Sequence, residues 1–338
     1  MNPRDGAARP GAAGLILLVA LTTSALVGVQ RARHAPSIAA PPPAAPAAPQ
    51  GGARLWIDMR NVNLHVDERA AIHVRRLRGE VLTATPGDTA VLDDPRSFRI
   101  RITSGTVALG GDDLSALLNE VVFGYPGSPL RKLHVRMQGA SLVQSGVMRK
   151  GVDLPFTLTA TPKLEPDGSV RLHPTKLRLL GVDGAKLISA LGLHLDRMLD
   201  LRGAHGARVQ GDDILLDPTA IVPPPTIEGR LASIRVQGDE LVQEFVRTPD
   251  DTMFDTHVVA DSAVHNYVYF RGGRLRFGRL LMSDTDLLIA DADERNPFDL
   301  FLARYAGQLV AGFSQTLPSS ALRVTMPDYA ELARYRRL

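Results

Sequence analysis

Alternation of apolar and polar residues, interrupted at short intervals by glycine and proline, constrains the fold of this chain more than any other feature. The segments LWIDM (55–59) and FRIRI (98–102) carry a Leu, Ile, Met or Phe at every second position. A period of two is typical of a strand that buries one face. Turn-forming residues at 166–168 (PDG) and 210–213 (QGDD) separate further pairs of such segments. Because strands so close in sequence pair antiparallel by default, we expect a mostly antiparallel β fold.

Five segments depart from this period and predict helices. They are residues 114–122, 186–201, 239–247, 297–313 and 329–337. In the first two, apolar residues recur every three or four positions, as on the apolar face of an amphipathic helix. The helices interrupt the strands without alternating regularly with them, which argues against a doubly wound fold. The expected class is therefore α+β with antiparallel sheet dominating.

The first 53 residues differ in composition from the rest. Residues 12–29 contain no charge and, as a helix, span roughly 27 Å, enough for the hydrocarbon core of a bilayer. No small-x-small cleavage site follows, which favours an uncleaved signal anchor over a cleaved signal peptide. Residues 30–53 are rich in proline and alanine and predict an extended linker. We expect residues 1–11 to form a cytoplasmic tail, and residues 54–338 to fold in the bacterial periplasm, held to the inner membrane by a single pass.

The charge distribution argues against nucleic-acid binding. The chain has 39 Lys and Arg and 36 Asp and Glu, and residues 1–53 hold four arginines and one aspartate. The remainder is therefore balanced, whereas binding to phosphates requires a clustered excess of cations. The absence of cysteine excludes disulfides, thiolate metal sites and a cysteine nucleophile.

No common hydrolase or nucleotide-binding motif is present. His65 and His73 are eight residues apart, too far along a strand or helix to share a metal except across a chain reversal, and a second pair, His257 and His265, has the same spacing. Asp255 lies on the same face as His257 if the segment is extended, but no nucleophile adjoins them. We expect no catalytic residue, no metal and no cofactor. An envelope hydrolase built around Asp255 and His257 is an alternative.

Long apolar faces are the strongest functional signal. An antiparallel sheet must cover its apolar face, and here the first two predicted helices and another sheet layer are available. If these layers fit tightly they form an ordinary core, and if they diverge they line a groove for an acyl chain. Periodicity alone does not distinguish the two. The candidate groove residues are Leu114, Leu117, Leu118, Val121, Val122, Leu187, Ile188, Leu191, Leu195 and Leu199.

The order of elements over residues 114–242 resembles the LmeA-like proteins, bacterial envelope proteins related to the tubular lipid-binding (TULIP) superfamily. The most suggestive segments are KGVDLP (150–155), DGSVRLHP (167–174) and GDDILLDP (211–218). The similarity is one of layout and covers somewhat over a third of the chain; residues 254–328 extend beyond it. It implies a long curved sheet wrapped around amphipathic helices, with an apolar groove that holds lipid. It transfers no catalytic residues.

These features together predict a non-enzymatic protein that binds or transfers a lipid of the phospholipid or isoprenoid type at the membrane of the cell envelope. A scaffold that carries no lipid is the first alternative. It would pair an exposed strand edge with an envelope protein partner.

Overall fold

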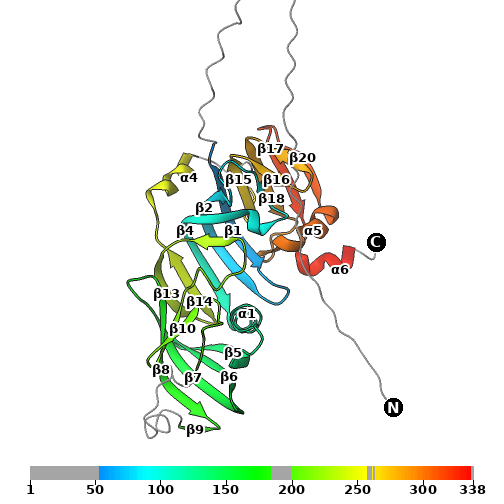
Figure 1. The fold of residues 1–338 in the computed structure, drawn as a ribbon. Coiled ribbons are helices and arrows are strands. Elements are labelled where there is room, and N and C mark those ends of the chain that lie inside the picture. Colours follow the sequence, from blue (N-terminus) through cyan, green and yellow to red (C-terminus); the bar gives the residue numbers. More distant parts are fainter. Residues whose placement is uncertain (1–52, 184–198, 257–260, 262, 336–338) are drawn as a thin grey trace, which may run out of the picture. The chain divides into compact units, whose positions relative to one another are not determined.

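The computed structural model describes residues 53–183, 199–256, 261 and 263–335 (Figure 1). They belong to one compact unit. Three sheets, one of them curled into a half-barrel, dominate it, and most strand pairs are antiparallel, which confirms the mostly antiparallel β fold. Within this part of the chain, none of the helices combines the length and apolar character that a membrane span requires. The predicted anchor and nearly all of the predicted linker lie outside the described residues.

The largest sheet joins strands from the N-terminal and C-terminal parts of the described sequence. Its members are β1 (Leu55–His65), β2 (Ala71–Thr83), β4 (Phe98–Gly110), β12 (Thr226–Glu228), β13 (Leu231–Gln237), β14 (Glu240–Phe245), β15 (Tyr267–Gly272), β18 (Thr285–Asp291), β19 (Phe298–Phe301), β20 (Phe313–Thr316) and β21 (Leu322–Met326). They lie in the order β13-β14-β4-β2-β1-β15-β18-β21-β20, with β12 beside β4 and β19 beside β1. We call this the large sheet.

A second sheet of seven strands consists of consecutive hairpins. It contains β5 (Leu130–Gln138), β6 (Ser141–Lys150), β7 (Val152–Leu164), β8 (Val170–Leu179), β9 (Val182–Asp183), β10 (Ala207–Gln210) and β11 (Asp213–Leu216). The order is β10-β11-β8-β7-β6-β5, with β9 beside β8. The turns predicted at 166–168 and 210–213 are confirmed, because each joins two paired strands. A third, small sheet has the order β17-β16-β3 and consists of β3 (Ala90–Val91), β16 (Leu275–Phe277) and β17 (Leu280–Met282).

The predicted helix at 114–122 is confirmed, with a change of geometry along its length. α1 (Gly111–Leu117) continues into η2 (Leu118–Val122), a turn of π-helix. Ser115 and Asn119 tie this helix to β5, the edge strand of the seven-stranded sheet. The Ser115 Oγ accepts the Val135 N–H at 2.7 Å, and the Asn119 amide pairs with both the N–H and the carbonyl of Leu133 at 2.9 and 2.7 Å. The helix thereby satisfies backbone groups that an exposed edge would leave open.

Two of the predicted helices are wrong in whole or in part. The segment 239–247 forms β14 over Glu240–Phe245, because β4 and β13 pair with its two edges, and so short a segment fits a strand as well as a helix. The segment 297–313 begins as β19, which pairs parallel with β1, and becomes helical only at η4 (Leu302–Arg304) and α5 (Tyr305–Ala311).

The remaining helical elements are short. The segment predicted at 329–337 is helical as η5 (Tyr329–Glu331) and α6 (Leu332–Tyr335). Three further short elements are η1 (Pro95–Ser97), η3 (Pro249–Thr252) and α4 (Met253–Thr256). The predicted helix 186–201 lies outside the described residues except for Leu199–Leu201, which are not helical.

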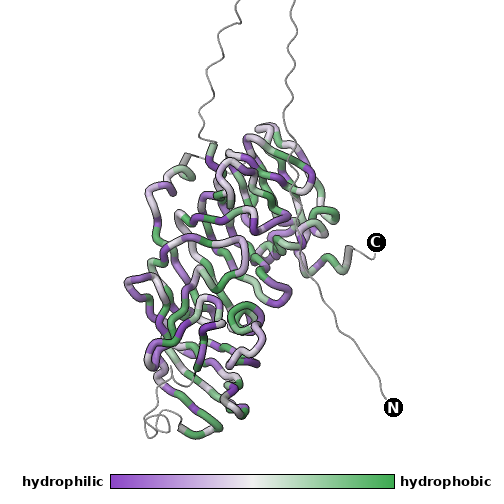
Figure 2. The backbone as a smooth tube through the Cα atoms, in the orientation of Figure 1, coloured by the Kyte–Doolittle hydropathy of each residue, from purple (hydrophilic) through white to green (hydrophobic). Residues whose placement is uncertain are grey.

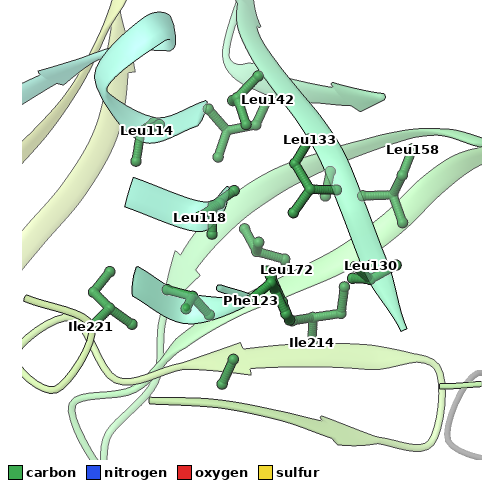
Figure 3. Close-up of a cluster of buried hydrophobic side chains, with 14 of the residues drawn as sticks. Leu114, Leu118, Phe123, Leu130, Leu133, Leu142, Leu158, Leu172, Ile214 and Ile221 are labelled. Atoms are coloured by element: carbon green, nitrogen blue, oxygen red, sulfur yellow. The ribbon is translucent and has the colours of Figure 1, made fainter. Parts of the chain in front are cut away.

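The buried side chains form two large clusters. One lies between the seven-stranded sheet and the helix α1–η2, where Leu118, Phe123 and Leu172 point toward one another (Figure 3). The other covers one face of the large sheet and includes Ile57 and Phe298. Alternating hydropathy along the strands is visible as alternating colour in Figure 2 and places apolar side chains on these inner faces.

Candidate functional site

A narrow apolar cavity connects the two clusters. The large sheet contributes side chains from β1, β2, β4 and β14, and the seven-stranded sheet contributes side chains from β5, β6, β7, β8 and β11. The helix α1–η2 and the proline-rich loop between β11 and β12 complete the wall. The cavity measures about 140 Å³. We call it the groove.

The wall of the groove is apolar almost throughout. Of the described residues that line it, only Gln144 and Gln243 carry a polar side chain. Leu241, Gln243 and Phe245 follow one another at every second position of β14, so one face of that strand points into the groove. On β7, Leu158 and Ala160 do the same. Such a lining is chemically suited to hydrocarbon and offers little to a charged ligand.

Gln243 is a buried residue in the wall of the groove. It is only 7% exposed, and its side chain makes no hydrogen bond to a described group. An unpaired amide in a closed core costs free energy, whereas an amide in the wall of a ligand site can bond an ester or hydroxyl oxygen of the ligand. Gln243 is therefore the best candidate for a group that orients a bound molecule.

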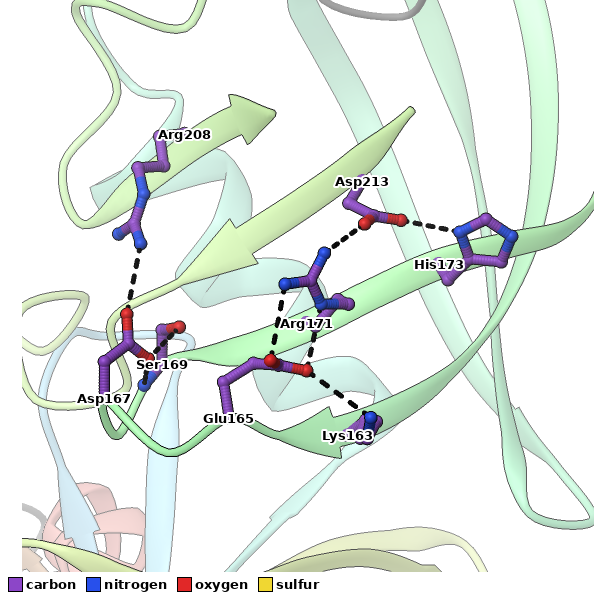
Figure 4. Close-up of polar contacts among 8 residues, drawn as sticks. All are labelled: Lys163, Glu165, Asp167, Ser169, Arg171, His173, Arg208 and Asp213. Atoms are coloured by element: carbon purple, nitrogen blue, oxygen red, sulfur yellow. Dashed lines mark hydrogen bonds and ion pairs between the residues drawn. The ribbon is translucent and has the colours of Figure 1, made fainter. Parts of the chain in front are cut away.

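The opposite face of the seven-stranded sheet is polar. Val170 and Leu172 of β8 line the groove, while Arg171 points the other way and forms a bidentate pair with Glu165 and an ion pair with Asp213 (Figure 4). These hydrogen bonds raise the pKa of the Arg171 guanidinium. His173 bonds to the other oxygen of Asp213, and Lys163, Asp167, Ser169 and Arg208 complete this surface in Figure 4. The sheet is thus apolar toward the groove and solvated outside, as period-two strands require.

The helix that the sequence singled out contributes to the groove in part. Leu114, Leu117 and Leu118 line it. Val121 and Val122 pack in the same cluster without reaching the groove, as does Leu199. The remaining four candidates, Leu187, Ile188, Leu191 and Leu195, lie outside the described residues.

Sequence reasoning missed the half of the groove that the large sheet supplies. Met59, Val74 and Ile102 have the spacing of strand residues, and that spacing shows which face is buried but not what covers it. A usable signal was present in the two glutamines, because each occupies a strand position where the alternation calls for an apolar residue.

The histidine pair on β1 and β2 does not form a metal site. Among the described residues, no group of three or more His, Asp or Glu side chains is arranged to hold a metal ion. His73 bonds to Asn61, and His65 Nε2 lies 2.5 Å from the Asp299 carboxylate. Leu64 and Val66 line the groove, so His65 points to the opposite face of the strand. His257 and the side chain of Asp255 lie outside the described residues.

A buried acidic cluster surrounds the end of β1, away from the groove. Asp328 accepts the N–H of Asp299 at 2.7 Å, and Asn266 donates to Asp291 at 3.0 Å. Burial raises the pKa of Asp291 to about 6 and raises that of Asp328. Burial is the largest influence on the pKa of His65 and lowers it, but the hydrogen bond to Asp299, the charge of that carboxylate and the Asp67 carbonyl together outweigh it, and the net shift is upward.

The raised pKa of Asp291 predicts a pH-dependent stability. Since the folded carboxyl titrates near 6 and the unfolded one near 3.8, the folded protein binds this proton more tightly. Stability from this group is therefore highest below pH 4 and falls as the pH rises toward 6, by at most about 3 kcal/mol. We expect Asp291→Asn to flatten that decline, as measured by urea unfolding at pH 4.5, 5.5 and 7 (about the range of the titration).

Asp293→Asn is the matched control, because Arg295 lowers the pKa of Asp293 and that group titrates below this range. An Asp291→Asn variant whose stability declines with pH as steeply as the unsubstituted protein would contradict the assignment.

The chain matches no protein-family model, no curated protein and no solved structure.

Proposed function

We propose that this protein binds the hydrocarbon chain of a lipid in the groove and thereby holds or transfers lipid in the bacterial cell envelope. The observation that carries the proposal is a cavity that crosses both apolar clusters and is lined, in the part of the chain that the structure describes, by apolar side chains and two amides. An ordinary core packs such side chains against one another and leaves few voids larger than a water molecule.

The size of the groove favours a single linear chain. An apolar cavity of ~150 Å³ stays dry and accepts a benzene-sized group, and the groove is of that size. Each methylene that leaves water contributes about 0.8 kcal/mol, so a segment of about six carbons contributes on the order of 5 kcal/mol before ordering costs. Gln243 then bonds the first polar oxygen of the lipid.

The layout of the chain supports a relationship to the LmeA-like proteins of the TULIP superfamily. In this proposal the two sheets and the helix α1–η2 correspond to the curved sheet and amphipathic helices of that fold. Residues 12–29 anchor the protein in the inner membrane, and the linker 30–53 holds the domain in the periplasm. The linker confines the domain to the neighbourhood of the bilayer and so raises its effective concentration there.

The decisive experiment is to identify bound lipid directly. Residues 49–338, produced in a bacterial periplasm, are extracted with organic solvent, and the extract is analysed by mass spectrometry. The proposal expects a phospholipid or isoprenoid lipid in near-stoichiometric amount. A monodisperse, lipid-free domain that also takes up no lipid from vesicles would refute it.

Filling the groove should expel the lipid. In Leu118→Trp the indole should extend into the cavity and displace about two methylenes of the lipid chain. Their lost burial weakens binding by about tenfold, so that less lipid is bound at the same total concentration. Leu281→Trp is the control, because Leu281 is exposed on β17. Circular dichroism establishes that both variants are folded. Equal lipid content in the two variants would show that the lipid binds elsewhere.

A scaffold without lipid is the second candidate, favoured by one observation. β20 ends the order of the large sheet, and all four of its residues, Phe313 included, are exposed. An extended segment of an envelope protein could add to this edge as a further strand. In that case Phe313→Asp abolishes partner binding and Leu118→Trp leaves function unchanged.

A further inference from the structure

Two neighbouring turns at one end of the seven-stranded sheet expose large apolar side chains. Val152 begins β7 directly after Gly151, and Leu180 lies in the turn that joins β8 to β9, followed by Val182. The exposed fractions are 64% for Val152, 62% for Leu180 and 57% for Val182. The Leu180 N–H donates at 2.9 Å to the carbonyl of Pro155 on β7, three residues along that strand from Val152. We call these three side chains the apolar tip.

The backbone conformation at Leu180 is unfavourable for a leucine. Leu179 pairs with Val182, so Leu180 and Gly181 form a two-residue hairpin loop, and their φ angles are 52° and 81°. Positive φ at both positions favours Asn-Gly, and a leucine there is strained. Leu180 therefore occupies a conformation unfavourable to it and projects into solvent, where packing does not compensate. Backbone strain that no packing contact offsets indicates a functional role.

Cationic residues surround the apolar tip. Arg131, Lys132, Arg149 and Arg178 are exposed on the adjoining strands β5, β6 and β8. Of these, Arg131 forms an ion pair with Asp153, the second residue of β7. The other three form no ion pair with a described residue. Asp183 lies opposite Arg178 in the β8–β9 pairing, so these four cations stand against two acidic residues, Asp153 and Asp183. The end of the sheet thus combines projecting aliphatic groups with an excess of positive charge.

We propose that the apolar tip inserts into the surface of an anionic lipid bilayer. Val152, Leu180 and Val182 would enter the headgroup and acyl boundary, while the surrounding arginines and Lys132 pair with phosphates. A bilayer demands only projecting apolar groups and cations at one level, which is what the two turns provide. A protein partner would require a shaped surface with defined polar contacts. This inference is independent of the groove, because none of the three side chains lines it.

Residues 49–338 suit the test, because every member of the buried clusters lies at Leu55 or beyond and the unit supplies its own cores. Co-sedimentation is measured with vesicles of equal parts phosphatidylcholine and phosphatidylglycerol and with vesicles of phosphatidylcholine alone. The domain should bind the mixed vesicles, bind the neutral ones weakly, and dissociate as salt is added.

Leu180→Asn separates membrane binding from folding. Asparagine accepts positive φ, so this variant should unfold at the same or a higher temperature, yet bind mixed vesicles about tenfold more weakly. Leu281→Asn, an exposed leucine on β17, is the matched control and should bind like the unsubstituted domain. Leu118→Trp should also bind vesicles normally, so failure of the groove and failure of the tip are distinguishable.

The absence of cysteine allows a direct reading of insertion. A polarity-sensitive dye on Leu180→Cys should shift to shorter wavelength with mixed vesicles, and the same dye on Leu281→Cys should not. Equal vesicle binding by Leu180→Asn and the unsubstituted domain would overturn the proposal. So would a domain that ignores mixed vesicles, or one that self-associates or captures a protein through the tip.

Discussion

Gln308→Ala is expected to lower the free energy of unfolding by about 4 kcal/mol. Gln308 is fully buried on α5, where its amide nitrogen donates to the carbonyls of Asp299 and Pro327, each at 2.9 Å. Its amide oxygen accepts the Phe301 N–H at 3.1 Å. Truncation leaves three buried backbone groups without a partner and opens a cavity. Urea unfolding of the domain measures the loss.

Gln315→Ala is the control for this substitution. Gln315 is exposed on β20, and its replacement should change the stability by less than about 0.5 kcal/mol. If Gln308→Ala destabilised the domain by under about 1 kcal/mol, another group would have to replace the lost bonds, and α5 would not be fixed to β19 as described.

Gly312→Ala should be comparably damaging, for a steric reason. Gly312 follows α5, and a Cβ on it would lie 2.1 Å from the backbone carbonyl oxygen of Thr325 on β21. Its φ of −96° is open to any residue, so the clash alone opposes substitution. Relief requires β20 to move from β21, and we expect a loss of about 3 kcal/mol or more.

Gly307→Ala provides the comparison within the same helix. There the added Cβ meets only the end of the Leu332 side chain at 3.2 Å, which can rotate away, and alanine favours helix. Thermal unfolding should show Gly307→Ala near the unsubstituted protein and Gly312→Ala far below it. Similar midpoints for both variants would argue against the close approach of β20 and β21.

The alternation in the sequence located the strands with a half-buried face. LWIDM and FRIRI became parts of β1 and β4, because one side of each faces an apolar cluster and the other does not. The four residues of β19 show no alternation, since all are buried. Their strand character comes from parallel pairing with β1, more than 200 residues earlier, and no local pattern encodes such a contact.

The groove was predictable on its helical side only. The apolar spacing at Leu114, Leu117 and Leu118 identified a face that must be covered, and these residues do line the groove. The facing wall comes from the large sheet, and its distance from the helix depends on how the two layers meet. Whether two apolar faces touch or stand apart depends on the tertiary structure, and the periodicity of the sequence carries no information about that distance. Gln243 is the local irregularity that marks the gap.

The pairing of β1 also sets the time at which the domain can be completed. One edge of β1 pairs with β2 directly after it, whereas the other edge pairs with β15 and β19, and the His65–Asp299 contact spans 234 residues. At a synthesis rate of about 5–20 residues per second, that edge stays open for roughly 10 to 50 seconds. An unpaired strand edge is a ready partner for other chains or for a chaperone that holds extended segments. The nascent protein therefore spends this interval with one edge of a central strand open to such partners.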